Sequence, residues 1–287
     1  MRLPFIILTP VCVMLGVATA MWTSGRVNSY HCILALIGAI SAHISVNALN
    51  EYFDFMSGLD SRTTRTAFSG GSGTLPEHKE LSRQTLCIGV IALSITTVIG
   101  AYFLFVRGLS LLPLGVLGLL IILTYTPWLS RNFVLCLIAP GLGFGLIMVM
   151  GTNLVLSGEY SCTAFFASLV PFFLVSDLLL LNQFPDVEAD QTVGRRNLPI
   201  VIGRRNSSLV YGAFLLAAHL AIIFGVWFQH LPKACLLGLG GVVVALPAFF
   251  GAYRYSENIS KLIPYMALNV TVNLLMPVLV AIGMFVG

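Results

Sequence analysis

The sequence predicts an all-α, polytopic membrane protein: a single domain, residues 1–287, folded as a bundle of nine transmembrane helices. Hydrophobic residues make up 57% of the 287 positions and charged residues only 9%, whereas a soluble domain carries about 25% charged residues. The apolar residues also gather in stretches long enough to cross a bilayer core, which takes ~20 residues per helix. The lipid bilayer is therefore the expected surroundings of most of the chain.

Nine apolar stretches of sufficient length follow one another along the chain. They cover residues 3–24, 30–56, 84–106, 109–129, 133–156, 161–183, 207–228, 233–253 and 261–286. The first is interpreted as a retained helix rather than a signal peptide, because it lacks a convincing small-residue cleavage site and further spans follow it. Two connections, 57–83 and 184–206, are long, and long loops in a compact bundle are usually functional or disordered.

The basic residues predict how the bundle lies in the membrane. With the N-terminus in the cytoplasm, twelve Lys and Arg residues, Arg2 among them, fall on the cytoplasmic side and three on the other. Cytoplasmic loops of membrane proteins carry such an excess of positive charge. Both long loops then share the cytoplasmic face, and the C-terminus lies outside. We expect an integral protein of a prokaryotic plasma membrane.

Charge and cysteine spacing disfavour a nucleic-acid partner and a disulfide framework or zinc site. The net charge is only +4, without a basic tail or run, so nucleic acid is not an expected partner. The six cysteines form no C-x-x-C pair. We interpret them as packed thiols rather than as a disulfide framework or a zinc site.

A polar stripe ends the second predicted span. His43, Asn47, Asn50 and Asp54 are spaced by four, three and four residues, which places them on one helical face. Such a stripe must face the bundle interior or a wet cavity, because contact with lipid is costly. Interhelical hydrogen bonds alone are the alternative, and for His43 both interpretations stay open. Asp60 follows a glycine and is expected just beyond the helix end.

The sixth predicted span leads into a second acidic group. Asn182, Asp186 and Asp190 lie four residues apart, and Arg195 and Arg196 follow them. Carboxylates are the hard oxygen ligands that Mg²⁺ prefers, and bound Mg²⁺ usually bridges to substrate phosphates. Arginines hold phosphate oxygens in a bidentate fork. A solvated loop of mixed charge would explain this group alone, but two acidic groups at one face are more specific.

Two facing carboxylate groups favour chemistry on a diphosphate. Mg²⁺ and arginines together neutralise the charge of a departing pyrophosphate. If the diphosphate is allylic, C–O cleavage leaves a stabilised carbocation, which needs the dry pocket that a helix bundle can supply. A lipophilic isoprenoid tail can enter such a bundle sideways from the membrane, and an electron-rich acceptor would capture the cation.

The two acidic groups resemble the signature motifs of the UbiA superfamily of intramembrane prenyltransferases. The matching segments are Asn50-Glu-Tyr-Phe-Asp54-Phe-Met-Ser-Gly58-Leu-Asp60 and Asp186-x-x-x-Asp190. Tyr125-Thr-Pro-Trp-Leu-Ser-Arg131 is similar to the family's tyrosine–proline–basic segment, and glycines 141, 143, 145, 151 and 158 to its glycine-rich fifth helix. The resemblance implies nine transmembrane helices, a Mg²⁺ requirement, and transfer of polyprenyl groups from diphosphates to aromatic acceptors.

Spacing within the first motif indicates a branch of that family. Asp54 and Asp60 are six residues apart, similar to the 1,4-dihydroxy-2-naphthoate branch of menaquinone biosynthesis, whereas the 4-hydroxybenzoate branch usually has four. Glu51 stands where many members have aspartate, which keeps the charge. Residues 68–75 resemble a glycine- and serine-containing loop of that branch, with a flexible linker as the alternative. Another aromatic acceptor, or cyclisation of the donor by a UbiA-type terpene cyclase, stays open.

The resemblance implies a role for each polar residue. Mg²⁺ and the donor diphosphate are expected at Asn50, Asp54, Asp60, Asp186 and Asp190, supported by Asn47 and Asn182. The candidate catalytic residues are Asp54, Asp186, Tyr125 and Asp177. Tyr125 is expected to border the cation with its ring face, or to be an interfacial aromatic. Asp177, an acid inside a span, is expected to bind the acceptor or take a proton.

Other residues have two possible roles each. The candidate diphosphate ligands Arg62, Arg65, Arg131, Arg195 and Arg196 can each be a positive-inside anchor instead. Tyr265, Asn269 and Asn273 are four residues apart and either line the acceptor cavity or hold helices together. Gly141-x-x-x-Gly145 favours close helix packing over a catalytic role.

A cation transporter and a CDP-alcohol phosphotransferase are the rival functions from other classes. A cation transporter usually places its ion site near the membrane midplane, whereas here only Asp177 is deep. A CDP-alcohol phosphotransferase shares the D-x-x-x-D spacing, but the D-G-x-x-A-R run that it requires is absent from the sequence.

Overall fold

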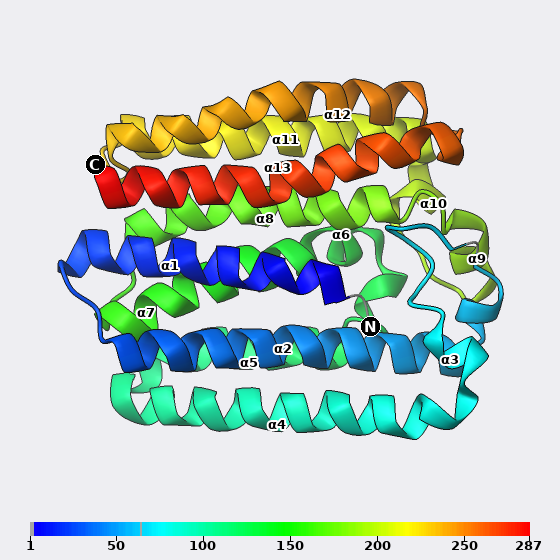
Figure 1. The fold of residues 1–287 in the computed structure, drawn as a ribbon, viewed down its shortest axis with the longest axis horizontal. Coiled ribbons are helices and arrows are strands. Elements are labelled where there is room, and N and C mark those ends of the chain that lie inside the picture. The colour runs from blue at the N-terminus through cyan, green and yellow to red at the C-terminus, as the bar shows by residue number, and fades with distance from the viewer. Residues whose placement is uncertain (1–2, 64) are drawn as a thin grey trace.

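The computed structural model describes residues 3–63 and 65–287, and every regular element in this part of the chain is a helix. Arg2, one of the predicted cytoplasmic anchors, lies outside the described residues. Figure 1 shows the long helices side by side, with the short helices α3, α9 and α10 gathered at one end. We call this end the motif face, because both acidic motifs reach it, and the other end the opposite face.

Eight helices are long and apolar enough to cross a membrane by length and composition. They are α1 (Leu8–Ser24, after η1, Leu3–Ile7), α2 (Ser29–Met56), α4 (Ser82–Arg107), the series α6–η6–α7 (Phe133–Gly141, Leu142–Met150, Gly151–Ser157), α8 (Cys162–Asn182), α11 (Arg204–Trp227), η7–α12 (Lys233–Gly241, Val242–Arg254) and α13 (Ile259–Val286). The all-helical membrane fold is thus confirmed.

The predicted span at residues 109–129, the fourth of the nine, is shorter than expected. Residues 109–129 form η4 (Leu109–Leu111) and α5 (Leu112–Thr124), and the chain then turns through residues 125–128. Pro127 lies in this turn, and proline has no backbone N–H with which to continue a helix. The prediction of nine spans therefore holds approximately, with one short member.

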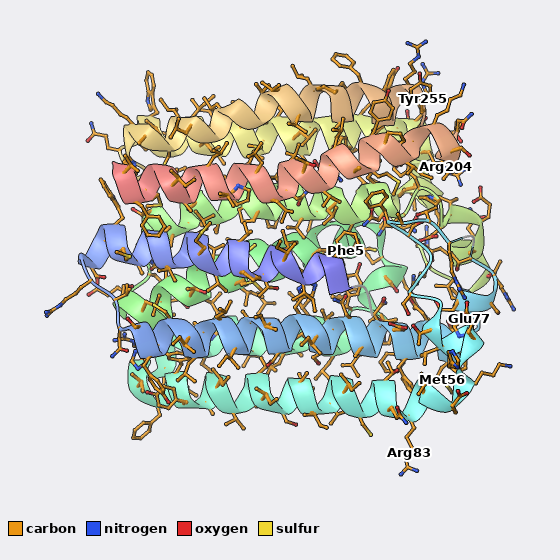
Figure 2. All side chains as sticks on the ribbon, in the orientation of Figure 1. Phe5, Met56, Glu77, Arg83, Arg204 and Tyr255 are labelled. Atoms are coloured by element: carbon orange, nitrogen blue, oxygen red, sulfur yellow. The ribbon has the colours of Figure 1, made fainter. Side chains whose placement is uncertain are left out.

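Both long loops fold into short helices at the motif face. The first contains η2 (Leu59–Ser61), α3 (Thr74–Glu77) and η3 (Lys79–Leu81), the second α9 (Val187–Thr192) and α10 (Leu198–Ile202), and η5 (Leu129–Arg131) joins α5 to α6. In Figure 2 the side chains of Glu77 and Arg204 lie at this end of the bundle. Asn197 starts α10, where its side chain accepts the N–H of Ile200 as an N-cap.

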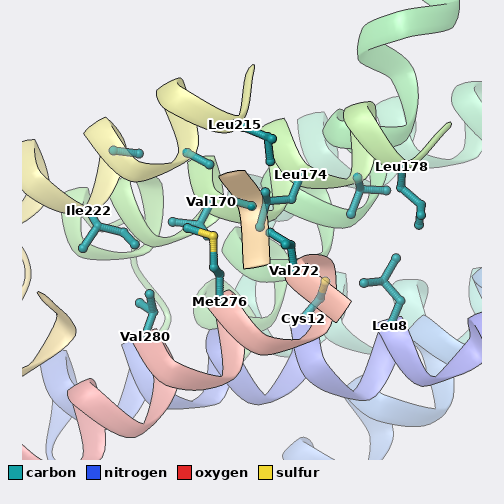
Figure 3. Packing of buried hydrophobic residues seen from close by; sticks show 14 of the residues in the cluster. Leu8, Cys12, Val170, Leu174, Leu178, Leu215, Ile222, Val272, Met276 and Val280 are labelled. Carbon is teal, nitrogen blue, oxygen red and sulfur yellow. The ribbon is translucent and has the colours of Figure 1, made fainter. Parts of the chain in front are cut away.

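The main core lies where α1, α8, α11 and α13 meet (Figure 3). Cys12, Leu174 and Met276 have no exposed surface there, and Leu215 is 5% exposed. Because lipid is as apolar as these side chains, close packing rather than hydrophobicity holds membrane helices together. All six cysteines are free thiols, and Cys12, Cys136 and Cys235 are buried, whereas Cys87 and Cys162 are exposed. The prediction of packed thiols therefore holds for only part of the set.

The glycine-rich series α6–η6–α7 has two different faces. A Cβ on Gly145 would lie 2.6 Å from the backbone nitrogen of Phe172 on α8, and one on Gly141 would meet the Phe172 carbonyl. This confirms the predicted close packing at Gly141-x-x-x-Gly145. A Cβ on Gly143 or Gly151 would meet nothing within 4 Å, so these two glycines leave open space beside the helix.

Candidate active site

Two cavities lie along α2. The polar cavity, about 260 Å³, is lined by both acidic motifs and by the loop at residues 68–72. The apolar cavity, about 520 Å³, is lined by α2, α4, α5 and the α6–η6–α7 series. Together they fall in the size range of small-molecule sites, about 300–1,000 Å³. Seven residues line both cavities and form what we call the neck: His43, Asn47, Asn50, Tyr125, Pro140, Phe144 and Leu179.

The apolar cavity is deep. Along α2 it extends from Asn50 in the neck to Ala35, which at 1.5 Å per residue is about 22 Å. The hydrocarbon core of a bilayer is ~30 Å thick. The cavity therefore follows α2 through most of the thickness of a membrane.

Arg195 joins the two acidic motifs. Its guanidinium donates to Asp54 at the end of α2 and, at 3.1 Å, to Oδ1 of Asp190 in α9. Asn197 donates to the other Asp190 oxygen at 2.7 Å. Burial alone would lower the pKa of Arg195. The neighbouring carboxylates of Asp54 and Asp190 have the larger combined effect and raise the Arg195 pKa. The prediction that the two motifs meet at one face is therefore confirmed.

A second set of contacts ties the glycine loop, residues 68–75, to other acids of the same two motifs. The Gly70 N–H donates to Asp186 Oδ2 at 3.1 Å, and the Ser72 hydroxyl donates to Glu51. Gly71 has φ +67°, and a Cβ there would lie 2.7 Å from Asp60 Oδ1, so only glycine lets the loop approach this closely. The loop thus lines the polar cavity and is not merely a linker.

Asp60 lies in η2 at the edge of the polar cavity and is 7% exposed. Burial, with a further contribution from the Glu51 carboxylate, raises the pKa of Asp60 to about 6. Burial likewise raises the pKa of Asp190, against the opposing effect of Arg195. A cation in this cavity would stabilise the ionised form of both groups.

The oxygen donors of the polar cavity fit Mg²⁺. Asn182 lines the cavity, and its buried Oδ1 has no hydrogen-bond partner among the described residues. Within that part of the chain, no three His, Cys, Asp or Glu side chains converge into a preformed metal site. Mg²⁺ does not require one, because it usually binds one or two carboxylates together with substrate phosphates and water.

The amides and the tyrosine of the neck lie beside the acids. Asn50 donates through Nδ2 to Thr126 Oγ1 at 3.0 Å, and Asn47 lines both cavities. The Tyr125 hydroxyl lies 3.9 Å from the sulfur of Cys136. Asn47, Asn50 and Tyr125 each line both the polar and the apolar cavity.

The five arginines predicted as diphosphate ligands differ in where they lie relative to the polar cavity. Of the five candidate arginines only Arg195 lines the polar cavity. Arg62, Arg65, Arg131 and Arg196 have exposed side chains outside its lining, and Arg65 pairs with Glu77 at 2.8 Å. Their predicted roles as diphosphate ligands stay predictions.

Asp177 lies on the face of α8 that points away from both cavities. The residues of α8 that line the polar cavity are Val175, Leu178, Leu179 and Asn182. Asp177 comes two residues after Val175, so its side chain points to the opposite side of the helix. Asp177 is fully buried, and neither carboxylate oxygen has a hydrogen-bond partner among the described residues. Its position gives no support to the predicted catalytic role.

Asn269 and Asn273 on α13 belong to the same interior region. Asn269 accepts from the Tyr211 hydroxyl at 3.2 Å and donates to the backbone oxygen of Asp177 at 3.4 Å. Asn273 donates to the Asn269 carbonyl at 2.9 Å. Neither lines either cavity, which agrees with the helix-holding alternative. Tyr265 stacks on Tyr255, with ring centroids 5.6 Å apart.

Four residues that contact the predicted side chains were not themselves predicted from the sequence: Thr9, which is hydrogen-bonded to His43, and Thr126, Cys136 and Asn197. Asn197-Leu198-Pro199 has the pattern of a helix start, with an N-cap residue before a first-turn proline. That pattern explains the bond to Ile200 but not the second bond, to Asp190. The other three lie within apolar or turn segments and carry no distinguishing pattern.

The profile of the UbiA prenyltransferase family matches residues 9–286. The chain belongs to this family. It is 24% identical over 216 residues to the 1,4-dihydroxy-2-naphthoate octaprenyltransferase of Bacillus subtilis, covering 74% of the chain and 68% of that protein.

Solved UbiA structures share the fold. A UbiA homologue from Aeropyrum pernix superposes with a TM-score of 0.76 at 19% identity, over 100% of this chain and 98% of that one. A homologue from Archaeoglobus fulgidus, solved with DMAPP and Mg²⁺, superposes with a TM-score of 0.58 at 15% identity, over 96% and 98%. The predicted family is therefore confirmed.

Proposed function

We propose that this UbiA family member transfers a polyprenyl group from an allylic diphosphate to an aromatic acceptor, in a reaction that depends on Mg²⁺. One observation carries the proposal: an acid-lined polar cavity at the motif face adjoins a deep apolar cavity, and the seven neck residues line both. A charged head and a long hydrocarbon tail joined end to end are the features of a polyprenyl diphosphate.

The polar cavity holds the head of the donor. Asp54, Asp60, Asp186 and Asp190 supply carboxylate oxygens, and the side-chain oxygen of Asn50 adds a neutral ligand. Mg²⁺, when bound, neutralises the diphosphate and makes it a better leaving group. Arg195 lies among these acids and contributes positive charge where the leaving oxygen becomes negative.

The apolar cavity holds the tail of the donor. A depth of about 22 Å along α2 suits a chain of several isoprene units rather than one. The neck surrounds the carbon that ionises, and Tyr125 offers it an aromatic face that stabilises positive charge. Burial of this region excludes water, which would otherwise capture the cation.

For the acceptor we favour 1,4-dihydroxy-2-naphthoate, which would place the enzyme in menaquinone biosynthesis. Two observations support this choice: the six-residue interval between Asp54 and Asp60, and the name of the Bacillus subtilis relative. The excess of Lys and Arg at the motif face supports a cytoplasmic active site.

A turnover assay in nanodiscs tests the proposal. Geranylgeranyl and longer diphosphates are supplied with 1,4-dihydroxy-2-naphthoate or 4-hydroxybenzoate, with and without Mg²⁺, and the products are analysed by mass spectrometry. We expect a Mg²⁺-dependent prenylated naphthoquinol. Release of pyrophosphate with a cyclised hydrocarbon would replace the proposal with a terpene cyclase. No consumption of diphosphate, together with ion flux in proteoliposomes, would favour a transporter.

A further inference from the structure

His43 occupies an unusual position in the neck. It lies on α2, is 5% exposed, and lines both the polar and the apolar cavity. Its Nδ1 is hydrogen-bonded to Thr9 Oγ1 of α1 at 2.7 Å, and its ring meets the Phe144 ring edge-on, with centroids 4.7 Å apart. Among the described residues none hydrogen-bonds Nε2, so this nitrogen is available to a ligand in the neck.

Few side chains in the neck could accept a proton in place of His43. Of the seven neck residues, only His43 and Tyr125 carry an ionisable side chain. The Tyr125 hydroxyl lies next to the sulfur of Cys136. On α2 the ligand candidates Asn50 and Asp54 lie seven and eleven residues after His43, about 10 and 16 Å along the helix axis. Asn50 and Asp54 therefore lie towards the diphosphate end of the proposed donor site, whereas His43 lies deeper along α2, among the neck residues.

Transfer to an aromatic ring requires a base at this point. A phenolic ring attacks far more readily as its hydroxyl loses a proton, because the oxygen electrons then reach the ring carbon. A general base must lie within hydrogen-bond reach of that proton and contributes about 10²–10⁴-fold to the rate. An imidazole fixed through one nitrogen, with the other facing the substrate, is a common form of such a base.

We propose that His43 is the general base that takes the hydroxyl proton of the aromatic acceptor. As the donor C1–O bond breaks, its electron pair leaves with the diphosphate. The acceptor O–H pair becomes a C=O bond, its proton passes to His43 Nε2, and the ring π electrons form the new bond to C1. A naphthoate ring then loses carbon dioxide from its carboxylate, and another acceptor loses its ring proton to the departing diphosphate. In both cases the C–C or C–H electron pair restores the aromatic ring, and the oxygen takes its proton back from His43.

Thr9 is a positioning residue in this scheme. Thr9 is fully buried on α1. When His43 carries its proton on Nδ1, this N–H donates to the Thr9 hydroxyl, and the lone pair of His43 Nε2 is left facing the neck. Thr9→Ser keeps this bond, whereas Thr9→Val removes it with little change in shape. We expect Thr9→Val to lower the rate of transfer about tenfold, as outer-shell substitutions do, and Thr9→Ser to retain it.

The decisive variant is His43→Gln, which keeps a polar side chain but cannot take a proton. His219→Gln is the matched control, because His219 also bonds through Nδ1, to the Leu215 carbonyl at 2.7 Å, but lines neither cavity. Formation of the prenylated aromatic is measured together with Mg²⁺-dependent binding of the donor diphosphate. Both are repeated with an acceptor analogue whose hydroxyl is more acidic.

For His43→Gln we expect a loss of about 10²-fold or more in transfer, unchanged binding of the donor diphosphate, and a smaller loss with the more acidic acceptor. For His219→Gln we expect a rate of prenyl transfer within about twofold of the wild-type rate. A wild-type rate in His43→Gln, a parallel loss of donor binding, or an equal loss with every acceptor would each overturn the proposal.

This inference rests on the proposed function, and the two fail differently. If the wild-type protein makes no prenylated aromatic from any acceptor, the proposed function fails. If the wild-type protein makes one and His43→Gln behaves as His219→Gln does, only the role of His43 fails.

Discussion

Helices α2 and α13 carry the same kind of sequence pattern and use it in different ways. Each has asparagines at helical spacing inside an apolar span. On α2, Asn47 and Asn50 line both cavities. On α13, Asn269 and Asn273 are almost fully buried and bond to each other and to Tyr211. One stripe faces open space and the other faces its neighbours.

The difference shows what polar spacing within a membrane span can and cannot predict. The cost of exposing amides to lipid turns both stripes inward. Whether the inside is a cavity or a packed contact depends on the helix opposite. α2 faces Gly143 and Gly151, which leave space, whereas α13 faces Tyr211, which is fully buried and fills it. Substitutions in the cavities and in the packed interior test this contrast.

Alanine at Asp54 or Asp186 removes a carboxylate from the polar cavity. We expect transfer to fall by at least about 10³-fold, because the charge of the departing diphosphate is then poorly neutralised. Mass spectrometry of the product measures this loss, and gel filtration checks that the fold is retained. Full activity in both variants would contradict the assignment of the polar cavity to the diphosphate.

Arg195→Gln removes the cation that joins Asp54 to Asp190. Transfer is expected to fall about 10²-fold, the scale of losing one charge-stabilising donor. The affinity for Mn²⁺, followed by electron paramagnetic resonance, is expected to rise, because the two carboxylates lose a competing positive charge. Arg195→Lys, which keeps the charge, is the control. Lower metal affinity in Arg195→Gln would mean that the guanidinium supports the metal instead of competing with it.

Asn50→Ala and Asn269→Ala compare the two helices directly. Asn50→Ala is expected to slow transfer by about 10–100-fold with little change in Tm. Asn269→Ala leaves the buried Tyr211 hydroxyl without its acceptor and is expected to cost about 1–3 kcal/mol of stability, with little change in the rate per folded molecule. Thermal unfolding in detergent and turnover are measured on both. The reverse pattern would show that α13, not α2, faces the substrate.

Glycines 143 and 145 extend the comparison to a third helix. Gly143→Leu fills open space in the apolar cavity and is expected to shift activity toward shorter donor diphosphates, without loss of stability. Gly145→Ala forces a Cβ against the backbone of Phe172 and is expected to cost about 1–3 kcal/mol. A donor-length series and thermal unfolding separate the two effects. An unchanged length preference in Gly143→Leu would place the tail elsewhere.

The smallest effect concerns pH. Because the pKa of Asp60 is raised from 3.8 to about 6, the folded, metal-free protein favours the protonated carboxyl. Its contribution to stability is therefore present at low pH and is lost as the pH rises from about 4 through about 6. Over this interval the Tm of the metal-free wild type should fall relative to that of Asp60→Asn, while Mg²⁺ affinity rises. A constant difference in Tm would contradict the raised pKa.

Much of the fold followed from the sequence because hydropathy and bilayer thickness strongly constrain a membrane helix. The exception was the span at residues 109–129, where Pro127 ends the helix early. The acidic motifs were found because carboxylates are rare beside apolar spans. Their contacts were less predictable: the bond from Asn197 to Asp190 and the bond from Thr9 to His43 join segments whose relative positions are set by tertiary packing.

Asp177 illustrates the limit of such predictions. An ionisable residue within a span is a reasonable functional candidate, and the sequence offered no other acid as deep. Its helical phase relative to Asn182 places it on the far side of α8 from the cavities. The sequence alone indicates that Asp177 and Asn182 lie on different sides of one helix, because they are five residues apart. Which of the two sides faces the substrate depends on how the helices pack in the bundle.

The short helix α5 has a consequence for the membrane itself. With η4 it spans 16 residues from Leu109 to Thr124, about 24 Å at 1.5 Å per residue, against a hydrocarbon core of ~30 Å. Lipids beside a short helix accommodate by local thinning of the bilayer. Because α5 lines the apolar cavity, we expect this thinning beside the cavity wall. It would bring the phosphates of a membrane-borne donor closer to the level of the neck.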